Sequence, residues 1–137
     1  MRYALLIYVE PRESTAEQNI EVMNAYNAFT RSAVAAEVMR GGEALHEAKT
    51  ATSVRVRNGQ TLVTDGPFAE TKEEFGGFYL IEAPTLDEAI KWAAQIPGAA
   101  RGTIEVRPVV DFPSPSTTTE GLTDEQRAAV PATIAAG

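Results

Sequence analysis

Residues 62–77 read LVTDGPFAETKEEFGG, and this stretch decides how the chain is interpreted. A short apolar run stops at the DGPF tetrapeptide of residues 65–68, a charged connection follows, and a glycine pair leads into the apolar residues 78–81. Aspartate bonds to nearby backbone, glycine adopts positive φ and proline fixes φ, so these residue types favour a turn. The stretch predicts a strand, a turn and a second strand.

A hairpin is predicted immediately before this turn. Residues 53–64 alternate between apolar and polar on either side of Asn58-Gly59. Asn-Gly is typical of a type I′ turn, because both of its central residues need positive φ. A two-residue turn pairs Val54 with Val63. Three valines then share one face of the hairpin: Val54, Val56 and Val63.

The first third of the chain predicts a strand and a long helix. Residues 3–9 are apolar almost throughout, as in a buried strand. Residues 14–17 have the form of a capping box, and apolar residues at helical spacing follow. We expect a helix from residue 16 to about residue 40, stopped by Gly41-Gly42, and a short extended segment at residues 43–47. The expected buried positions of this helix are Val22, Tyr26, Phe29 and Ala33.

A second strand–helix–strand unit follows the central stretch. Residues 77–83 and 103–107 predict strands, and between them Thr85 and Glu88 form a second capping box. Pro97-Gly98 ends this helix. Its expected buried face is Leu86, Ala89, Ile90 and Ala93.

The composition changes beyond Phe112. Residues 113–119 read PSPSTTT, which is typical of a linker, and residues 123–126 predict the cap of a short helix that Pro131 ends. We therefore expect a domain at residues 1–112 and an extension at residues 113–137. The extension is either a mobile end or an arm on a neighbouring surface, and its alanines and valine favour the arm.

Composition excludes several classes of function. The chain has 137 residues, a length typical of one domain, and a net charge of −7, which disfavours nucleic acid and anionic membranes as partners. It has no cysteine and one histidine, which excludes thiolate chemistry and a multi-histidine metal site within one chain, although a carboxylate cation site stays open. No metal or cofactor is expected. Neither a signal peptide nor a membrane span is predicted, so we expect a cytoplasmic protein.

Without the hairpin, the predicted order of elements is βαββαβ. This order is that of a ferredoxin-like α+β unit, with two helices on one face of an antiparallel sheet. The strand at residues 3–9 is apolar on both faces, so the second face also needs a cover. A second copy packing sheet to sheet would provide it, which predicts a homodimer.

Five segments together resemble the YCII-related family, and in particular its DGPF subgroup, named for residues 65–68. The resemblance covers about residues 1–110. The segments are MRYALLIY at 1–8, TSVRVRNG at 52–59, VTDGPFAETKE at 63–73, GGFY at 76–79 and IEVRP at 104–108.

The resemblance implies a dimeric α/β barrel of ferredoxin-like halves, similar to muconolactone isomerase. Relatives include a dehydrochlorinase of a chlorinated hydroxyquinol that uses a His–Asp pair, with the histidine on the first helix. The predicted helix at residues 16–40 has no histidine, so this pair does not transfer to the chain. Members of the subgroup are often encoded beside extracytoplasmic-function sigma factors, which implies a regulatory association.

His46 and Asp65 are the candidate catalytic residues. His46 is the only histidine of the chain, and histidine is the residue type best suited to proton transfer, while Asp65 is a carboxylate in the turn that could face a ligand. The alternatives are a surface histidine and a purely structural turn. Pairing of the two side chains requires proximity that the sequence does not define.

The candidate ligand-binding residues lie on the same turn and beside it. They could form the rim of a cavity, or they could serve as turn, core and solvated surface residues. They are Asp65, Gly66, Pro67, Phe68, Tyr26 and Lys72.

Three functions remain open. The first is a dimeric barrel that binds a small metabolite, as a lyase or isomerase of cyclic or hydroxylated compounds, and it predicts a polar-spotted cavity with His46 or Asp65 facing inward. The second is a non-enzymatic accessory protein of a sigma factor, which predicts a filled core and a DGPF turn on an exposed apolar patch. The third is a structural dimer without a ligand.

Overall fold

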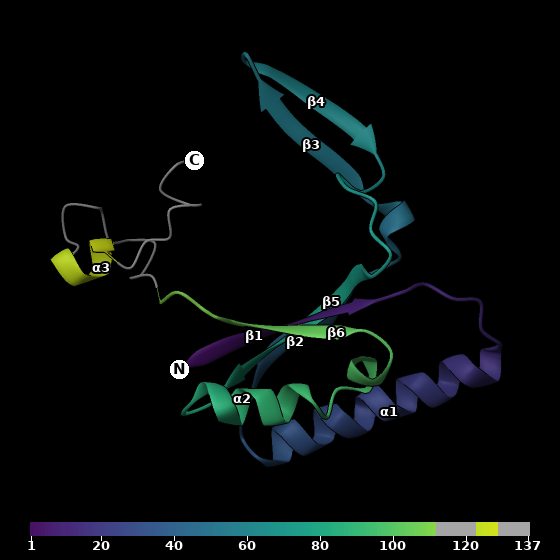
Figure 1. Ribbon diagram of the computed structural model, residues 1–137, viewed down its shortest axis with the longest axis vertical. Coiled ribbons are helices and arrows are strands. Elements are labelled where there is room, and N and C mark those ends of the chain that lie inside the picture. Colours follow the sequence, from purple (N-terminus) through teal and green to yellow (C-terminus); the bar gives the residue numbers. More distant parts are fainter. Residues whose placement is uncertain (112–122, 129–137) are drawn as a thin grey trace.

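The computed structural model describes residues 1–111 and 123–128. These residues form a mixed α+β fold, in which a four-stranded antiparallel sheet has two helices on one face and a separate hairpin rises on the other side (Figure 1). The elements are β1 (Arg2–Val9), α1 (Ala16–Ala35), β2 (Met39–Ala44), η1 (Ala48–Thr50), β3 (Thr52–Arg57), β4 (Gln60–Asp65), β5 (Glu74–Glu82), α2 (Leu86–Ala93), η2 (Pro97–Ala100), β6 (Thr103–Pro108) and α3 (Asp124–Ala128).

The strand order of the sheet is β2-β5-β1-β6, so β2 and β6 are its edges. Alternate residues of β1 point toward the helices, and Tyr3, Leu5 and Ile7 are buried there. From the helices, Phe29 of α1 and Ala89 of α2 pack into the same core. The opposite face, called the open face below, carries half-buried apolar side chains from the two central strands: Ala4, Leu6, Tyr8, Phe78 and Leu80.

The capping box of α1 lies one residue later than expected. The Thr15 hydroxyl accepts a hydrogen bond from the Gln18 amide at 3.1 Å, and the Gln18 side chain accepts one from the Thr15 amide at 2.9 Å. Glutamine therefore has the role that the sequence suggested for Glu17, because either side chain provides the required oxygen.

The predicted end of α1 near Arg40 is wrong, because the helix ends at Ala35. Glu37 adopts the left-handed conformation, with φ of 60°, that glycine usually supplies at a helix end. Its amide donates to Val34 O, and the next amide, from Val38, donates to Ala33 O. These two bonds form a Schellman motif, which ends the helix and turns the chain into β2. The glycine pair Gly41-Gly42, which was expected to stop the helix, therefore lies within the strand.

The start of α2 is confirmed only in part. Thr85 accepts a hydrogen bond from the Glu88 amide at 3.2 Å, whereas the Glu88 carboxylate bonds to Lys91 at 3.1 Å and does not complete a capping box. Of the four residues expected on the buried face of α2, two were predicted wrongly. Leu86 and Ile90 are 49% and 48% exposed, because the sheet covers only the stripe that includes Ala89 and Ala93.

The hairpin has the predicted register. Asn58 and Gly59 both have positive φ, and Val54 pairs with Val63 across the turn. Sheet pairing joins β3 and β4 to each other and to no other strand of the described residues.

The short helix predicted in the extension is present as α3. The Thr123 and Gln126 side chains cap each other's backbone amides at 3.2 and 2.9 Å. The predicted linker at 113–119 and the end at Pro131 lie outside the described residues, so the division at residue 112 stays a prediction. None of the helices described is long and apolar enough to cross a membrane.

Candidate functional site

Two cavities contain residues that the sequence singles out. The helix–sheet cavity, of about 520 Å³, lies between α1 and strands β2 and β5, and Tyr26 lines it. The hairpin-base cavity, of about 640 Å³, lies where the hairpin joins the sheet, and His46, Pro67 and Phe68 line it. The other three candidates, Asp65, Gly66 and Lys72, line neither of these two cavities.

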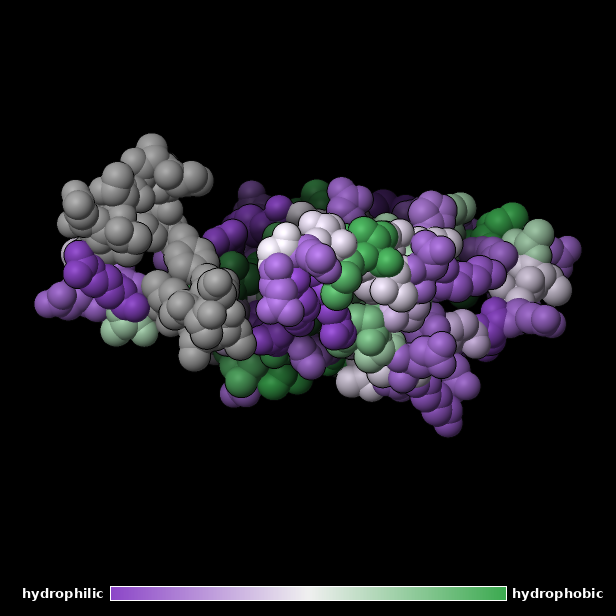
Figure 2. Space-filling view, turned by 90° about the horizontal axis from the view of Figure 1, so that it is seen from above, coloured by the Kyte–Doolittle hydropathy of each residue, from purple (hydrophilic) through white to green (hydrophobic). Residues whose placement is uncertain are grey.

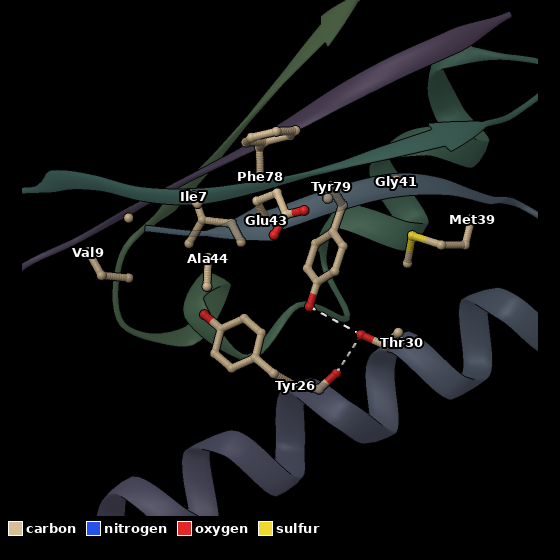
Figure 3. A pocket seen from close by; sticks show the side chains of 13 residues that line it. Ile7, Val9, Tyr26, Thr30, Met39, Gly41, Glu43, Ala44, Phe78 and Tyr79 are labelled. Atoms are coloured by element: carbon tan, nitrogen blue, oxygen red, sulfur yellow. Dashed lines mark hydrogen bonds between the residues drawn. The ribbon is translucent and has the colours of Figure 1, made fainter. Parts of the chain in front are cut away.

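The helix–sheet cavity exists because the sheet has very small residues beneath α1. Gly42 and Ala44 of β2 and Gly77 of β5 point toward the helix, beside Ile7 and Tyr79. Larger side chains at these three positions would fill the layer between helix and sheet. In Figure 3 the Ala44 methyl group points into this space, toward the ring of Tyr26.

Close approach of the two strands requires the glycines. A Cβ atom on Gly42 would lie 2.6 Å from the Phe78 carbonyl oxygen, and one on Gly77 would lie 2.8 Å from the Glu43 carbonyl oxygen. Both contacts are with backbone and cannot be relieved by a side-chain rotation. The floor of the cavity is therefore set by strand pairing.

Two hydrogen bonds at the cavity link Tyr79 of the sheet through Thr30 to the backbone of α1 (Figure 3). The Thr30 hydroxyl donates its only proton to the Tyr26 carbonyl oxygen at 3.0 Å. The Tyr79 hydroxyl lies 3.3 Å from the same Thr30 oxygen, so Tyr79 must be the donor in this contact. The Tyr79 oxygen keeps its lone pairs, with which it can accept a hydrogen bond from a ligand.

The Tyr26 phenol is held in its protonated form. Burial raises its pKa above the ordinary value, and nearby Tyr79 raises it further. A backbone hydrogen bond at Gly98 and the charge of Arg101 lower the pKa in part. The Tyr26 phenol is therefore neutral, and a neutral phenol can donate a hydrogen bond as well as accept one.

The charge in this cavity is low. Among the described residues, its lining contains one carboxylate, on the exposed Glu43 of the edge strand, and no basic side chain. The remaining polar groups are neutral hydroxyls and backbone. The arrangement suits a neutral molecule that is mainly apolar and has a few hydroxyl or carbonyl groups.

The hairpin-base cavity brings His46 and the DGPF turn together. Gly66 has φ of 98°, its amide donates to Ala51 O at 2.7 Å, and its carbonyl accepts from the Ser53 hydroxyl at 2.8 Å. The turn thereby closes the base of the hairpin, and Phe68 beyond it is 81% exposed. The role of His46 in proton transfer stays a prediction.

Asp65 and Lys72 lie outside this arrangement. Asp65 is the last residue of β4, exposed and paired with Thr52. Lys72 is exposed as well, and neither side chain forms an ion pair within the described part of the chain. No group of three or more histidines and carboxylates among the described residues could hold a metal ion.

The small strand residues that form the floor of the helix–sheet cavity were missed in the sequence. A signal was present, because the chain has two glycine pairs, Gly41-Gly42 and Gly76-Gly77. Glycine in strands often marks close backbone approach. Interpreting the first pair as a helix stop concealed this meaning.

Comparison with known proteins identifies the family. The YCII-related domain matches residues 1–113, so the chain belongs to the YCII-related family. An uncharacterised protein of Rhizobium meliloti (strain 1021) is 39% identical over an alignment of 114 residues, and the match covers 80% of this chain and 92% of that protein.

Among solved structures, the chain is similar to 5-chloro-2-hydroxyhydroquinone dehydrochlorinase from Burkholderia phenoliruptrix AC1100, in complex with 2,5-dihydroxybenzoquinone. The identity is 17% and the TM-score 0.45, over 80% of this chain and 93% of the other. Similarity this low carries no conclusion about the chemistry of this chain.

Proposed function

We propose that this protein binds a small, uncharged, ring-shaped molecule with hydroxyl or carbonyl groups in the helix–sheet cavity. One observation carries the proposal: the sheet lacks large side chains at Gly42, Ala44 and Gly77, beneath a helix that supplies Tyr26 and Thr30. The cavity volume of about 520 Å³ lies in the range of small-molecule sites. Apolar walls would bind the ring, and the hydroxyls would orient it.

Binding of phenol and cyclohexanone, followed by ligand-observed NMR, tests this proposal. Ala44→Leu should weaken both probes at least about tenfold, because the larger side chain occupies the space. Ala94→Leu is the matched control, because Ala94 is exposed at the end of α2 and outside the cavity. Equal binding by wild type and Ala44→Leu would disprove the proposal.

A lyase or isomerase reaction is the second candidate function. The observation in its favour is the protonated Tyr26 phenol, which could act as a general acid toward an oxygen that gains negative charge. Turnover of a ring substrate that is lost in Tyr26→Phe while binding persists would support this reaction. No contact in the described residues favours a sigma-factor partner, and this association stays an untested prediction.

We also propose that the fold is ferredoxin-like, that the chain belongs to the DGPF subgroup, and that two copies pair through their open faces as a dimeric barrel. The strand order β2-β5-β1-β6, with both helices on one face, supports the fold. The half-buried apolar residues of the open face, such as Leu6 and Phe78, support the pairing.

A further inference from the structure

The hairpin is incomplete on its own. Its valine face (Val54, Val56 and Val63) is 60 to 63% exposed, and the hydrogen bond between Gly66 and Ala51 at its base joins the two ends of the hairpin to each other, not to the sheet. A two-stranded hairpin is at best marginally stable in water. The valine face therefore indicates a contact that the described part of the chain does not make.

The position of the hairpin indicates where this contact lies. In Figure 1 the hairpin rises from the side of the sheet that the helices do not cover. A body that packs on the open face will therefore lie beside the hairpin. Seen from above, hydrophobic side chains form separate patches between hydrophilic ones (Figure 2), as expected for a surface with several small apolar contacts.

Charge favours a second copy as the partner. Arg55 and Arg57 lie on the face of the hairpin opposite the valines, and neither forms an ion pair with any described residue. When the valines pack on another body, these long cationic side chains lie at the margin of the contact, where an acidic body attracts them. The net charge of −7 makes a second copy of the chain such a body.

We propose that the hairpin is an exchanged arm: in the pair of copies, the valine face of each hairpin packs against the other copy. This inference rests on the pairing through open faces proposed above. In a two-fold arrangement each copy would give and receive one arm, so the contact would be made twice.

The exchange makes the hairpin-base cavity a composite site. Tyr8 belongs to the open face and also lines this cavity, where its ring lies 5.5 Å from that of Phe75. A copy that covers the open face at Tyr8 therefore becomes a wall of the cavity. His46 and the exposed Phe68 would face a space that two chains enclose.

Sedimentation equilibrium of the full chain and of two threonine variants tests the arm. Val54→Thr/Val63→Thr keeps the β-branched shape but removes the apolar contact, so the dissociation constant of the dimer should rise at least about tenfold. Leu62→Thr is the matched control, because Leu62 pairs with Arg55 on the opposite face. The dissociation constant of the Leu62→Thr dimer should stay within about twofold of the wild-type value.

Hydrogen exchange provides a second readout. Amides of β3 and β4 should exchange slowly above the dissociation constant and faster below it, while those of β1 should not depend on concentration. A wild-type dimer whose constant is unchanged in Val54→Thr/Val63→Thr would overturn the arm and leave the open-face pairing intact. A chain that is monomeric at every concentration would overturn both.

Discussion

Leu5 and Val54 are aliphatic residues in antiparallel strands of the same chain, yet Leu5 is fully buried and Val54 is 61% exposed. Leu5 lies in a central strand with a layer of helices against it. Val54 lies in a hairpin strand that, among the described residues, pairs with its own return strand alone. The two strands have the same local geometry and very different burial.

The difference shows that the signals that define a strand in the sequence are distinct from the burial that stabilises it. Alternation and an Asn-Gly turn are sufficient to define β3 and β4, because hairpin pairing is local. Stabilisation comes from apolar area removed from water, and in the described part of the chain β1 and its neighbours bury such area while the valine face of the hairpin does not. The body therefore gains stabilisation from its own core, whereas the hairpin depends on what surrounds it.

The largest expected effect comes from truncating one residue in each region. Leu5→Ala should lower the free energy of unfolding by about 2–5 kcal/mol, because it leaves a cavity in the core. Val56→Ala, in the hairpin, should change it by less than about 0.5 kcal/mol at dilutions where the copies are separate. Urea unfolding measures both. Equal losses would show that the hairpin is packed within one chain.

An intermediate effect is expected at the glycine pair of β5. Gly77→Ala should destabilise by about 1–3 kcal/mol, because the new methyl group meets strand backbone. Gly76→Ala is the control, because its Cβ would lie 3.9 Å from the Val9 side chain, an ordinary contact. Thermal unfolding of both variants measures the difference: a loss in Gly77→Ala alone indicates close approach of the strands, whereas equal losses indicate a general preference for glycine in this strand. A stable Gly77→Ala would contradict the proposed origin of the cavity floor.

The smallest effect concerns the pH dependence of stability. Tyr26 has a folded-state pKa above its ordinary value of 10.0, so the unfolded chain loses this proton first as pH rises. The contribution of Tyr26 is present below about pH 10 and is lost above it, up to its folded-state pKa. Tyr26→Phe should therefore lose less stability than wild type between pH 9 and 11, measured by urea unfolding. An unchanged slope would indicate that Tyr26 is not buried as described.

Local signals predicted much of the fold. The Asn58-Gly59 turn gave the register of the hairpin, because the two residues specify the turn directly. The end of α1 could not be found in the same way. Glutamate rarely takes the left-handed conformation, so Glu37 carries no signal for it, while Gly41-Gly42 is a strong but misleading one.

The candidate site was less predictable than the fold. His46 and Phe68 line one cavity, a proximity that the sequence does not define, whereas Asp65 does not line it. The helix–sheet cavity arises because β2 and β5, two strands far apart in the sequence, have very small residues where α1 lies over them. Such an absence becomes visible only when the register of β2 and β5 is known.

The fixed floor of the helix–sheet cavity has a consequence for how its ligand preference could change during evolution. Substitutions at Gly42 or Gly77 disturb strand pairing, so selection for stability would remove most of them. Met39 and Ala44 also line the cavity but belong to an edge strand, where a change of size has room. New ligand preferences would therefore arise mainly along one margin of the cavity, while the opposite wall stays constant.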